Sequence, residues 1–454
     1  MIAGVQQIAE DKSVKGVVVR GAGRAFCAGA EISEFAEPGE PLTEGLVETL
    51  FRLENLSVPV VALVHGFALG GGFEVTLNCH YRLGSSDAQF GLPEVNLGLL
   101  PGAGGTQRLP RLIGVIPSSD MLLYGNPVNA EKALKLGLID GILKEKTVEG
   151  RLKEAVSFLQ SLNGTIKRIS DLKVPDADQP DVIGKLDSIL KIANQKRKGE
   201  IAPDRIISCL KAAVLKKTFQ EGMKEEARLF AQLLASPEAR ALQHIFFAER
   251  AAAKIPKELT AEPQKISRVG VIGAGLMGGG IAMCCVDVGI PTVIIDVNQE
   301  FLNKGLDHIR KNYSKSVERK SITQEKMDKR MSLIKSSLNY EDLKDCDVVI
   351  EAVFEDMKLK KDIFTRLDAV CKPGCILATN TSGLNIDEIT SVTRRPADVV
   401  GMHFFSPANV MRLLENVKGK ASSPRAISTA MDFGKRIGKV AILVGNCPGF
   451  VSHF

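Results

Sequence analysis

The sequence predicts two α/β domains joined by a helical region, the second domain being a doubly wound parallel sheet. Residues 1–143 alternate short β-branched runs with Gly-rich turns and helical patterns. Residues 144–260 are mainly helical in pattern, and residues 268–454 return to the alternation. A length of 454 residues suits about three domains. We therefore expect domain spans of 1–165, 166–262 and 263–454.

The composition is that of an ordinary globular protein, with 44% apolar and 25% charged residues. A net charge of +6 without a Lys/Arg block gives no indication of a nucleic-acid partner. Nine cysteines without a C-x-x-C arrangement predict free thiols in a reducing compartment, and no metal site. No apolar run reaches the length of a membrane span.

In the first domain, residues 15–20 and 58–64 are β-branched runs followed by Gly-rich turns, which predicts strands. A helical pattern covers residues 147–162.

The helical region contains a Pro/Asp-rich loop at 174–181 and a helix start at Ser236-Pro237, with Pro at the first helical position. Five apolar residues at helical spacing predict one helix face: Phe219, Met223, Ala227, Phe230 and Leu234. Residues 254–267, which contain two prolines, are expected to be an inter-domain linker.

Strand-like runs recur through the last domain, most of them separated by helical patterns. They are Val269–Ile272, Thr292–Asp296, Asp347–Glu351, Ile376–Thr379 and Val399–Met402. This order is typical of a doubly wound parallel sheet.

A dinucleotide fingerprint opens this domain. Gly273, Gly275 and Gly278 follow the first strand and start a helix, and Asp296 ends the next strand. The glycines let the backbone approach a pyrophosphate, and the carboxylate accepts ribose hydroxyls and repels a 2′-phosphate, which favours NAD over NADP. The alternative is a Gly-rich turn in a sheet protein without a nucleotide. We assign cofactor contacts to Gly273, Gly275, Leu276, Met277 and Gly278, with Asp296.

A His–Glu pair follows further along. His403 ends a strand-like run and Glu415 lies 12 residues later. A His held by a carboxylate can take a hydroxyl proton while hydride leaves the same carbon. Ser382 also follows a strand and could bond the reacting oxygen. On spacing alone, a structural His with a surface Glu is the simpler interpretation.

Two glutamates lie beside Gly-rich segments of the first domain. Glu74 follows three glycines at the start of a helical segment, and Glu94 lies 20 residues on. The small-residue turns at 26–30 and 70–72 can aim backbone N–H groups at one ligand oxygen, forming an oxyanion hole. Two carboxyls near such a hole could activate water and deliver a proton. Loop glycines with two solvated glutamates remain an equal alternative.

These motifs resemble known families. The segments 26–32 (FCAGAEI), 68–74 (ALGGGFE) and 91–102 (GLPEVNLGLLPG) resemble the crotonase, or enoyl-CoA hydratase, family. This resemblance implies a spiral ββα fold for the first domain.

The second half resembles 3-hydroxyacyl-CoA dehydrogenases in its fingerprint and in 351–356 (EAVFED), 380–382 (NTS) and 403–407 (HFFSP). The order of domains is similar to that of the peroxisomal bifunctional enzymes of fatty-acid β-oxidation. Mitochondrial trifunctional α-subunits and bacterial counterparts share this order.

The resemblance also implies residue roles in the first domain. Ala30 and Gly71 would supply the N–H groups that hold a thioester oxygen. Glu74 and Glu94 would hydrate a 2-enoyl-CoA, and Glu94 would carry the proton when a 3-enoyl-CoA is isomerised.

In the dehydrogenase half, His403 would be the general base, oriented by Glu415, while Ser382 would contact substrate and nicotinamide. Glu355 and Lys360 match positions that contact NAD.

The implied function is hydration of 2-enoyl-CoA, isomerisation of 3-enoyl-CoA and NAD-linked oxidation of 3-hydroxyacyl-CoA by a peroxisomal monomer. Against the family pattern, we expect early strands and the C-terminal helical dehydrogenase domain to be absent, and His453 replaces an expected Asn. The chain ends without a peroxisomal targeting tripeptide. Hydration and NAD binding should therefore persist with dehydrogenase turnover greatly reduced. A non-catalytic NAD- or CoA-binding fragment is the alternative.

Overall fold

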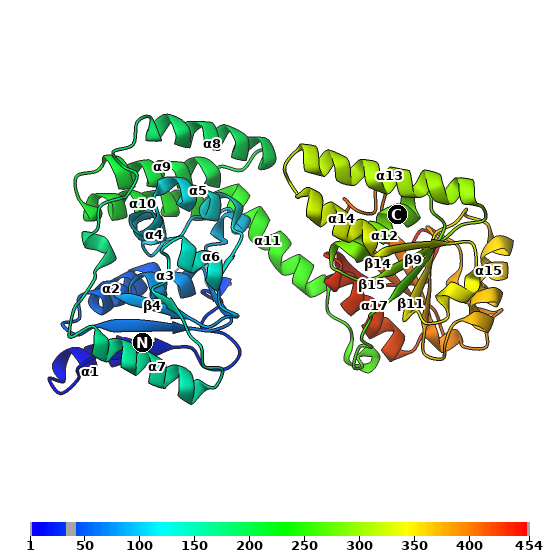
Figure 1. Ribbon diagram of the computed structural model, residues 1–454, viewed down its shortest axis with the longest axis horizontal. Coiled ribbons are helices and arrows are strands. Elements are labelled where there is room, and N and C mark those ends of the chain that lie inside the picture. The colour runs from blue at the N-terminus through cyan, green and yellow to red at the C-terminus, as the bar shows by residue number, and fades with distance from the viewer. Residues whose placement is uncertain (1, 33–41, 452–454) are drawn as a thin grey trace. The chain divides into compact units, whose positions relative to one another are not determined.

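The computed structural model describes residues 2–32 and 42–451, so His453 and the C-terminal tripeptide lie outside the described residues. The chain forms two compact units, Met1–Phe246 and Phe247–Phe454, which divide within helix α11 (Pro237–Ala252) (Figure 1). The expected domain spans of 1–165, 166–262 and 263–454 stay predictions.

The first unit contains two sheets. Strands β1 (Val17–Arg20), β2 (Val60–Val64), β4 (Tyr81–Gly84) and β7 (Gly141–Ile142) form a parallel four-stranded sheet in that order. Strands β3 (Phe67–Leu69), β5 (Gln89–Gly91) and β6 (Val128–Asn129) form the other sheet. The chain gives one strand to each sheet and then a helix, for example β2, β3 and α3, which is the repeating ββα pattern that the family resemblance implied.

Helices surround these sheets. They are α1 (Ile2–Glu10), α2 (Leu42–Glu54), α3 (Gly71–Leu77), η2 (Glu94–Leu97), α4 (Gly105–Ile113), α5 (Val115–Tyr124), α6 (Ala130–Lys135), α7 (Val148–Ser161), η3 (Ile169–Asp171), α8 (Val182–Lys196), α9 (Ala202–Leu215) and α10 (Phe219–Leu234). Helix α7 covers the outer face of the four-stranded sheet through Ala155 and Phe158. Helices α8, α9 and α10 lie beside α4 and α5 and share their apolar core (Figure 1).

Helix α10 buries much of the predicted face, since Phe219 and Phe230 are buried and Met223 and Leu234 are half-buried, but Ala227 is an exception. Its buried residues are Phe219, Gly222, Glu226, Leu229, Phe230 and Leu233. Ala227, expected on the apolar face, is exposed, because the tightly packed face passes through the carboxyl of Glu226 instead. The predicted start of the next helix is confirmed, since the Ser236 hydroxyl accepts the Ala239 N–H at 3.1 Å.

The second unit is built on one eight-stranded sheet. Its order is β10 (Ile334–Ser337), β9 (Thr292–Ile295), β8 (Val269–Ile272), β11 (Val348–Glu351), β12 (Ile376–Thr379), β13 (Val399–Phe404), β14 (Leu413–Lys418) and β15 (Val440–Gly445). Neighbouring strands are parallel except β13 and β14. All five predicted strands are confirmed, with ends within two residues.

Apolar layers cover both faces of this sheet, which makes it doubly wound. The helices of the unit are η4 (Lys257–Leu259), α12 (Leu276–Asp287), α13 (Gln299–Glu318), α14 (Gln324–Ser332), η5 (Tyr340–Leu343), α15 (Met357–Val370), α16 (Ile386–Thr390), η6 (Pro396–Asp398) and α17 (Pro424–Arg436). The segment 254–267 lies against α17, where the Ala261 N–H donates to the Ser428 hydroxyl at 2.9 Å. All nine cysteines are free thiols. Within residues 2–32 and 42–451, no helix has the length and apolar content to cross a bilayer.

Candidate active sites

Strand β3 brings the backbone N–H groups of Ala30 and Gly71 together. It pairs on one side with the turn at Cys27, whose N–H donates to the Phe67 carbonyl at 3.0 Å, and on the other with β5. A Cβ built on Gly71 would lie 3.8 Å from the Ala30 nitrogen. Neither N–H donates to another described residue. The arrangement supplies the pair of donors that an oxyanion hole needs.

The glycines of this turn have separate structural causes. Gly70 has a φ of 55°, in the left-handed region that favours glycine. A Cβ on Gly72 would lie 2.4 Å from the Cys27 carbonyl oxygen, which no side chain tolerates. These two residues keep the chain at Gly71 close to the turn that carries Ala30.

Glu74 projects from α3 into the interior, with 3% of its surface exposed. Its Oε1 accepts the N–H groups of Ala103 at 2.7 Å and Gly105 at 2.9 Å. Burial raises the pKa of Glu74, although these two N–H groups and the Arg108 guanidinium oppose the rise. The carboxyl is therefore held in one orientation by the loop that precedes α4.

Glu94 is the first residue of η2 and converges on the same place. A Cβ on Gly70 would lie 3.3 Å from its Oε1, and its Oε2 is shielded from solvent without a hydrogen-bond partner among the described residues. Burial, and then the neighbouring Glu74 carboxylate, raise the pKa of Glu94 well above its ordinary value. A carboxyl whose pKa is raised in this way is suited to general acid catalysis.

A third carboxyl, Glu226, reaches this cluster from α10 and was not predicted. It is fully buried and accepts the N–H groups of Gly104 at 2.7 Å and Thr106 at 3.0 Å. Burial first, and Glu74 second, raise the pKa of Glu226 to about 8. The sequence gives only a weak indication of this role, because a Glu within a helix rich in charged residues is usually interpreted as solvent-exposed.

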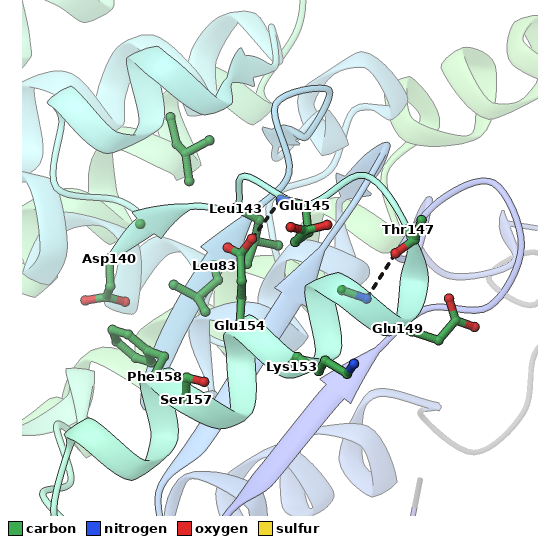
Figure 2. Close-up of a pocket in the computed structure, with 13 residues that line it drawn as sticks. Leu83, Asp140, Leu143, Glu145, Thr147, Glu149, Lys153, Glu154, Ser157 and Phe158 are labelled. Carbon is green, nitrogen blue, oxygen red and sulfur yellow. Dashed lines mark hydrogen bonds between the residues drawn. The ribbon is translucent and has the colours of Figure 1, made fainter.

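The cavity drawn in Figure 2 is a different feature. It has a volume of about 700 Å³ and lies between α7 and the β4 and β7 strands, lined by residues such as Leu83, Asp140, Lys153 and Phe158. Glu154 points across it and accepts the Glu145 N–H at 2.7 Å. None of the predicted site residues lines this cavity.

In the second unit, close packing requires glycine at positions 273 and 278 of the fingerprint, whereas Gly275 lies beside open space. A Cβ on Gly273 would lie 2.6 Å from the Ala352 carbonyl oxygen, and one on Gly278 would lie 1.8 Å from that of Gly273. A Cβ on Gly275 would meet nothing within 4 Å. Gly275 caps α12, which begins with the 54% exposed Leu276 and the half-buried Met277. The open space at a helix N-terminus fits a pyrophosphate.

Asp296 follows β9 and braces the same loop. Its Oδ2 accepts the Ala274 N–H at 2.6 Å, and its Oδ1 accepts the Val297 N–H at 2.7 Å. The partly exposed carboxylate is thus fixed next to the fingerprint turn.

His403 and Glu415 face each other across the antiparallel β13–β14 pair. The His403 Nδ1 lies 2.8 Å from Glu415 Oε2, and the Val451 N–H donates to Glu415 Oε1 at 3.2 Å. Both side chains are at most 7% exposed, and Phe405 stacks near the imidazole at 4.4 Å between ring centroids. The pairing fixes which ring nitrogen faces the carboxylate.

Ser382 sits in a polar network at the ends of β11 and β12. Its N–H and hydroxyl donate to Glu355 Oε1 at 2.8 and 3.2 Å. The fully buried Lys360 ammonium lies 2.7 Å from Glu351 and 3.4 Å from Glu355. Burial raises the pKa of Glu355, but Thr381, Lys360 and the Ser382 N–H outweigh it, so the pKa lies below its ordinary value.

The Lys360 ammonium therefore orients the Glu355 carboxylate through an ion pair, and Glu355 in turn accepts a hydrogen bond from Ser382. Direct contact of Lys360 and Glu355 with NAD stays a prediction.

Comparison with known proteins identifies two domain classes. Residues 1–174 match the family model of enoyl-CoA hydratase/isomerase. Residues 268–447 match that of the 3-hydroxyacyl-CoA dehydrogenase NAD binding domain. The first unit thus carries a crotonase-like domain, and the second unit is a Rossmann-type NAD-binding domain.

The chain is similar to peroxisomal bifunctional enzymes over nearly its whole length. It is 43% identical over 456 residues to the peroxisomal bifunctional enzyme of Danio rerio, covering 99% of this chain and 62% of the relative. The human enzyme of the same name is 41% identical over 460 residues, with the same coverage. The fatty acid oxidation complex subunit alpha of Shewanella amazonensis is 37% identical over 459 residues, covering 98% and 64%. The chain thus spans about three fifths of the length of these relatives.

Proposed function

We propose that the first unit adds water to 2-enoyl-CoA thioesters. The observation that carries this proposal is the convergence of Glu74 and Glu94 beside the N–H groups of Ala30 and Gly71. The two N–H groups stabilise the enolate oxygen that forms as the C3–O bond is made. One carboxylate takes a proton from water, and the other carboxyl gives a proton to C2, so the product is a 3-hydroxyacyl thioester.

The division of labour follows from the environments of the two carboxyls. Glu74 accepts two backbone N–H bonds, which favour its ionised form, whereas Glu94 Oε2 has no hydrogen-bond partner among the described residues and the pKa of Glu94 is raised well above its ordinary value. We therefore assign the base role to Glu74 and the acid role to Glu94. Transfer of a proton by Glu94 from C2 to C4 would isomerise a 3-enoyl thioester at the same site.

For the second unit we propose oxidation of the 3-hydroxyacyl product with NAD. NAD supplies the hydride acceptor when bound. His403, held by Glu415, takes the hydroxyl proton, and Ser382, fixed by Glu355, positions the substrate oxygen. The product of the first unit is the substrate class that this second site requires, which supports the assignment of both.

The hydratase proposal is tested by Glu94→Gln, with Glu131→Gln on the exposed surface of α6 as the matched control. Loss of crotonyl-CoA absorbance reports water addition. Because a general acid contributes roughly 100- to 10,000-fold, Glu94→Gln should lower turnover by at least about 100-fold. Turnover equal to that of the Glu131→Gln control would exclude the role of Glu94.

The non-catalytic alternative has its own signature. A binder without chemistry would melt at higher temperature with NAD or a CoA thioester present, by linkage, but would hydrate nothing. The names of the relatives favour a peroxisomal address, and we propose a monomer in solution. Imaging of a tagged chain and light scattering test these two points separately.

A further inference from the structure

We propose that Glu226 is a positioning residue of the hydratase site. Its carboxyl holds the Gly-rich loop at 103–106 against Glu74 and places a third acidic group beside the Glu74–Glu94 pair. This inference rests on the proposed hydratase function and deepens it, because it adds a residue from the helical region that follows the hydratase domain.

The contacts alternate along the loop. Ala103 and Gly105 donate their N–H groups to Glu74, while Gly104 and Thr106 donate theirs to Glu226. Four successive N–H groups at the start of α4 are thus divided between two carboxyls from different helices. If either carboxyl moves, it releases two N–H groups of the loop, and these alternate with the two N–H groups that the other carboxyl accepts. A buried N–H donor without a partner costs about 1–3 kcal/mol.

Close packing fixes α10 against this loop. A Cβ on Gly222 would lie 2.2 Å from Gln107 Oε1, and one on Gly102 would lie 2.9 Å from the Phe230 ring. Gly222, Glu226 and Phe230 are four residues apart, so one face of α10 makes all of these contacts. The Thr106 hydroxyl adds a 2.5 Å bond to Glu226 Oε2.

The charges around Glu226 come from four elements. Glu74 on α3 and Glu94 on η2 are acidic, and Cys209 on α9 is a buried thiol whose pKa lies above its ordinary value. Arg108 on α4 is the nearby cation, but its guanidinium is bonded to Glu54 at 2.6 Å. Because the pKa of Glu226 is raised to about 8, its carboxyl becomes negatively charged only as the pH rises through that value, and its charge then contributes to the raised pKa of Glu94.

The test compares Glu226→Gln with Glu225→Gln in the full chain, using the pH profile of crotonyl-CoA hydration. Glu225 is the matched control because it pairs with Arg228 on the solvent side of the same helix. Without the Glu226 charge, the pKa of Glu94 falls. The alkaline limb of the profile should then move to lower pH by about one unit, with kcat reduced and KM nearly unchanged. Glu225→Gln should reproduce the wild-type profile.

A purely structural Glu226 would change stability or the fraction of active protein without moving the limbs, and that result overturns the proposal. If Glu226→Gln does not fold, Thr106→Val decides the matter. Loss of the hydroxyl bond raises the pKa of Glu226, so the alkaline limb should shift in the same direction by less, and an unchanged profile overturns the proposal. An inactive wild-type chain instead refutes the hydratase function itself, and this inference with it.

Discussion

The substitution Gly275→Ala separates NAD binding from folding in the second unit. A Cβ at this position meets nothing within 4 Å, and its φ of −67° is ordinary for alanine. The free energy of unfolding should therefore stay within about 0.5 kcal/mol of wild type. The methyl group would, however, occupy the open space at the start of α12, where the pyrophosphate must approach the backbone.

Loss of one hydrogen bond to a charged group costs about 1.5–3 kcal/mol. Since about 1.4 kcal/mol corresponds to a tenfold change, the Kd for NADH should rise roughly 10- to 100-fold. The chain has no tryptophan, so enhancement of NADH fluorescence on binding can be followed without transfer from that residue.

Gly445→Ala is the matched control, because a Cβ there also meets nothing within 4 Å and the residue ends β15, outside the fingerprint. Equal NADH affinities for the two variants would contradict the assignment of Gly275 to the pyrophosphate site. A Gly275→Ala variant that unfolds would contradict the packing argument instead.

Two further predictions concern buried charges. Lys360→Met leaves the Glu351 carboxylate buried without its ammonium partner, so it should destabilise the second unit by about 3–5 kcal/mol in urea unfolding. Lys361→Met is the control, because it breaks a partly exposed ion pair and should cost less than about 1 kcal/mol. Equal losses of stability in the two variants would contradict this prediction. The pKa of Glu226 is raised from 4.5 to about 8, so its stabilising contribution is present below pH 4.5 and is lost as the pH rises to 8, with a slope of at most about 1.4 kcal/mol per pH unit. Urea unfolding from pH 5 to 8 should show a shallower decline for Glu226→Gln, and parallel curves would refute the assignment.

Five strands of the second unit could be predicted because they are buried on both faces, whereas the partly exposed edge strands β10 and β15, and β14 beside β15, were not predicted. Val269–Ile272 and Ile376–Thr379 are continuous apolar runs with abrupt ends, and the structure places the strands at the same residues. The fingerprint was equally clear, since Gly278 is required by contact with the Gly273 carbonyl five residues earlier and Gly273 has a φ of 100°, which favours glycine. Local causes of this kind leave local signals in a sequence.

Glu226 could not be predicted because its causes are not local. Apolar spacing alone placed Ala227 on the inner face of α10, whereas the partners that keep Glu226 buried lie about 120 residues earlier in the chain. A weak signal was present in retrospect: Gly222 and Phe230 flank Glu226 at four-residue spacing, and a helical glycine often marks close packing.

These contacts give the helical region a role beyond joining the two domains. The match to the hydratase family model ends at residue 174, but the first compact unit continues to Phe246. The loop that orients Glu74 is completed only when α10 delivers Glu226, so the geometry of the acid–base pair depends on the docking of a helix that lies beyond the matched domain. A spacer between two enzymes would not need a buried carboxyl at this point, because exposing it to water would avoid the cost of burial. The burial of Glu226 is explained if the helical region is part of the hydratase site itself.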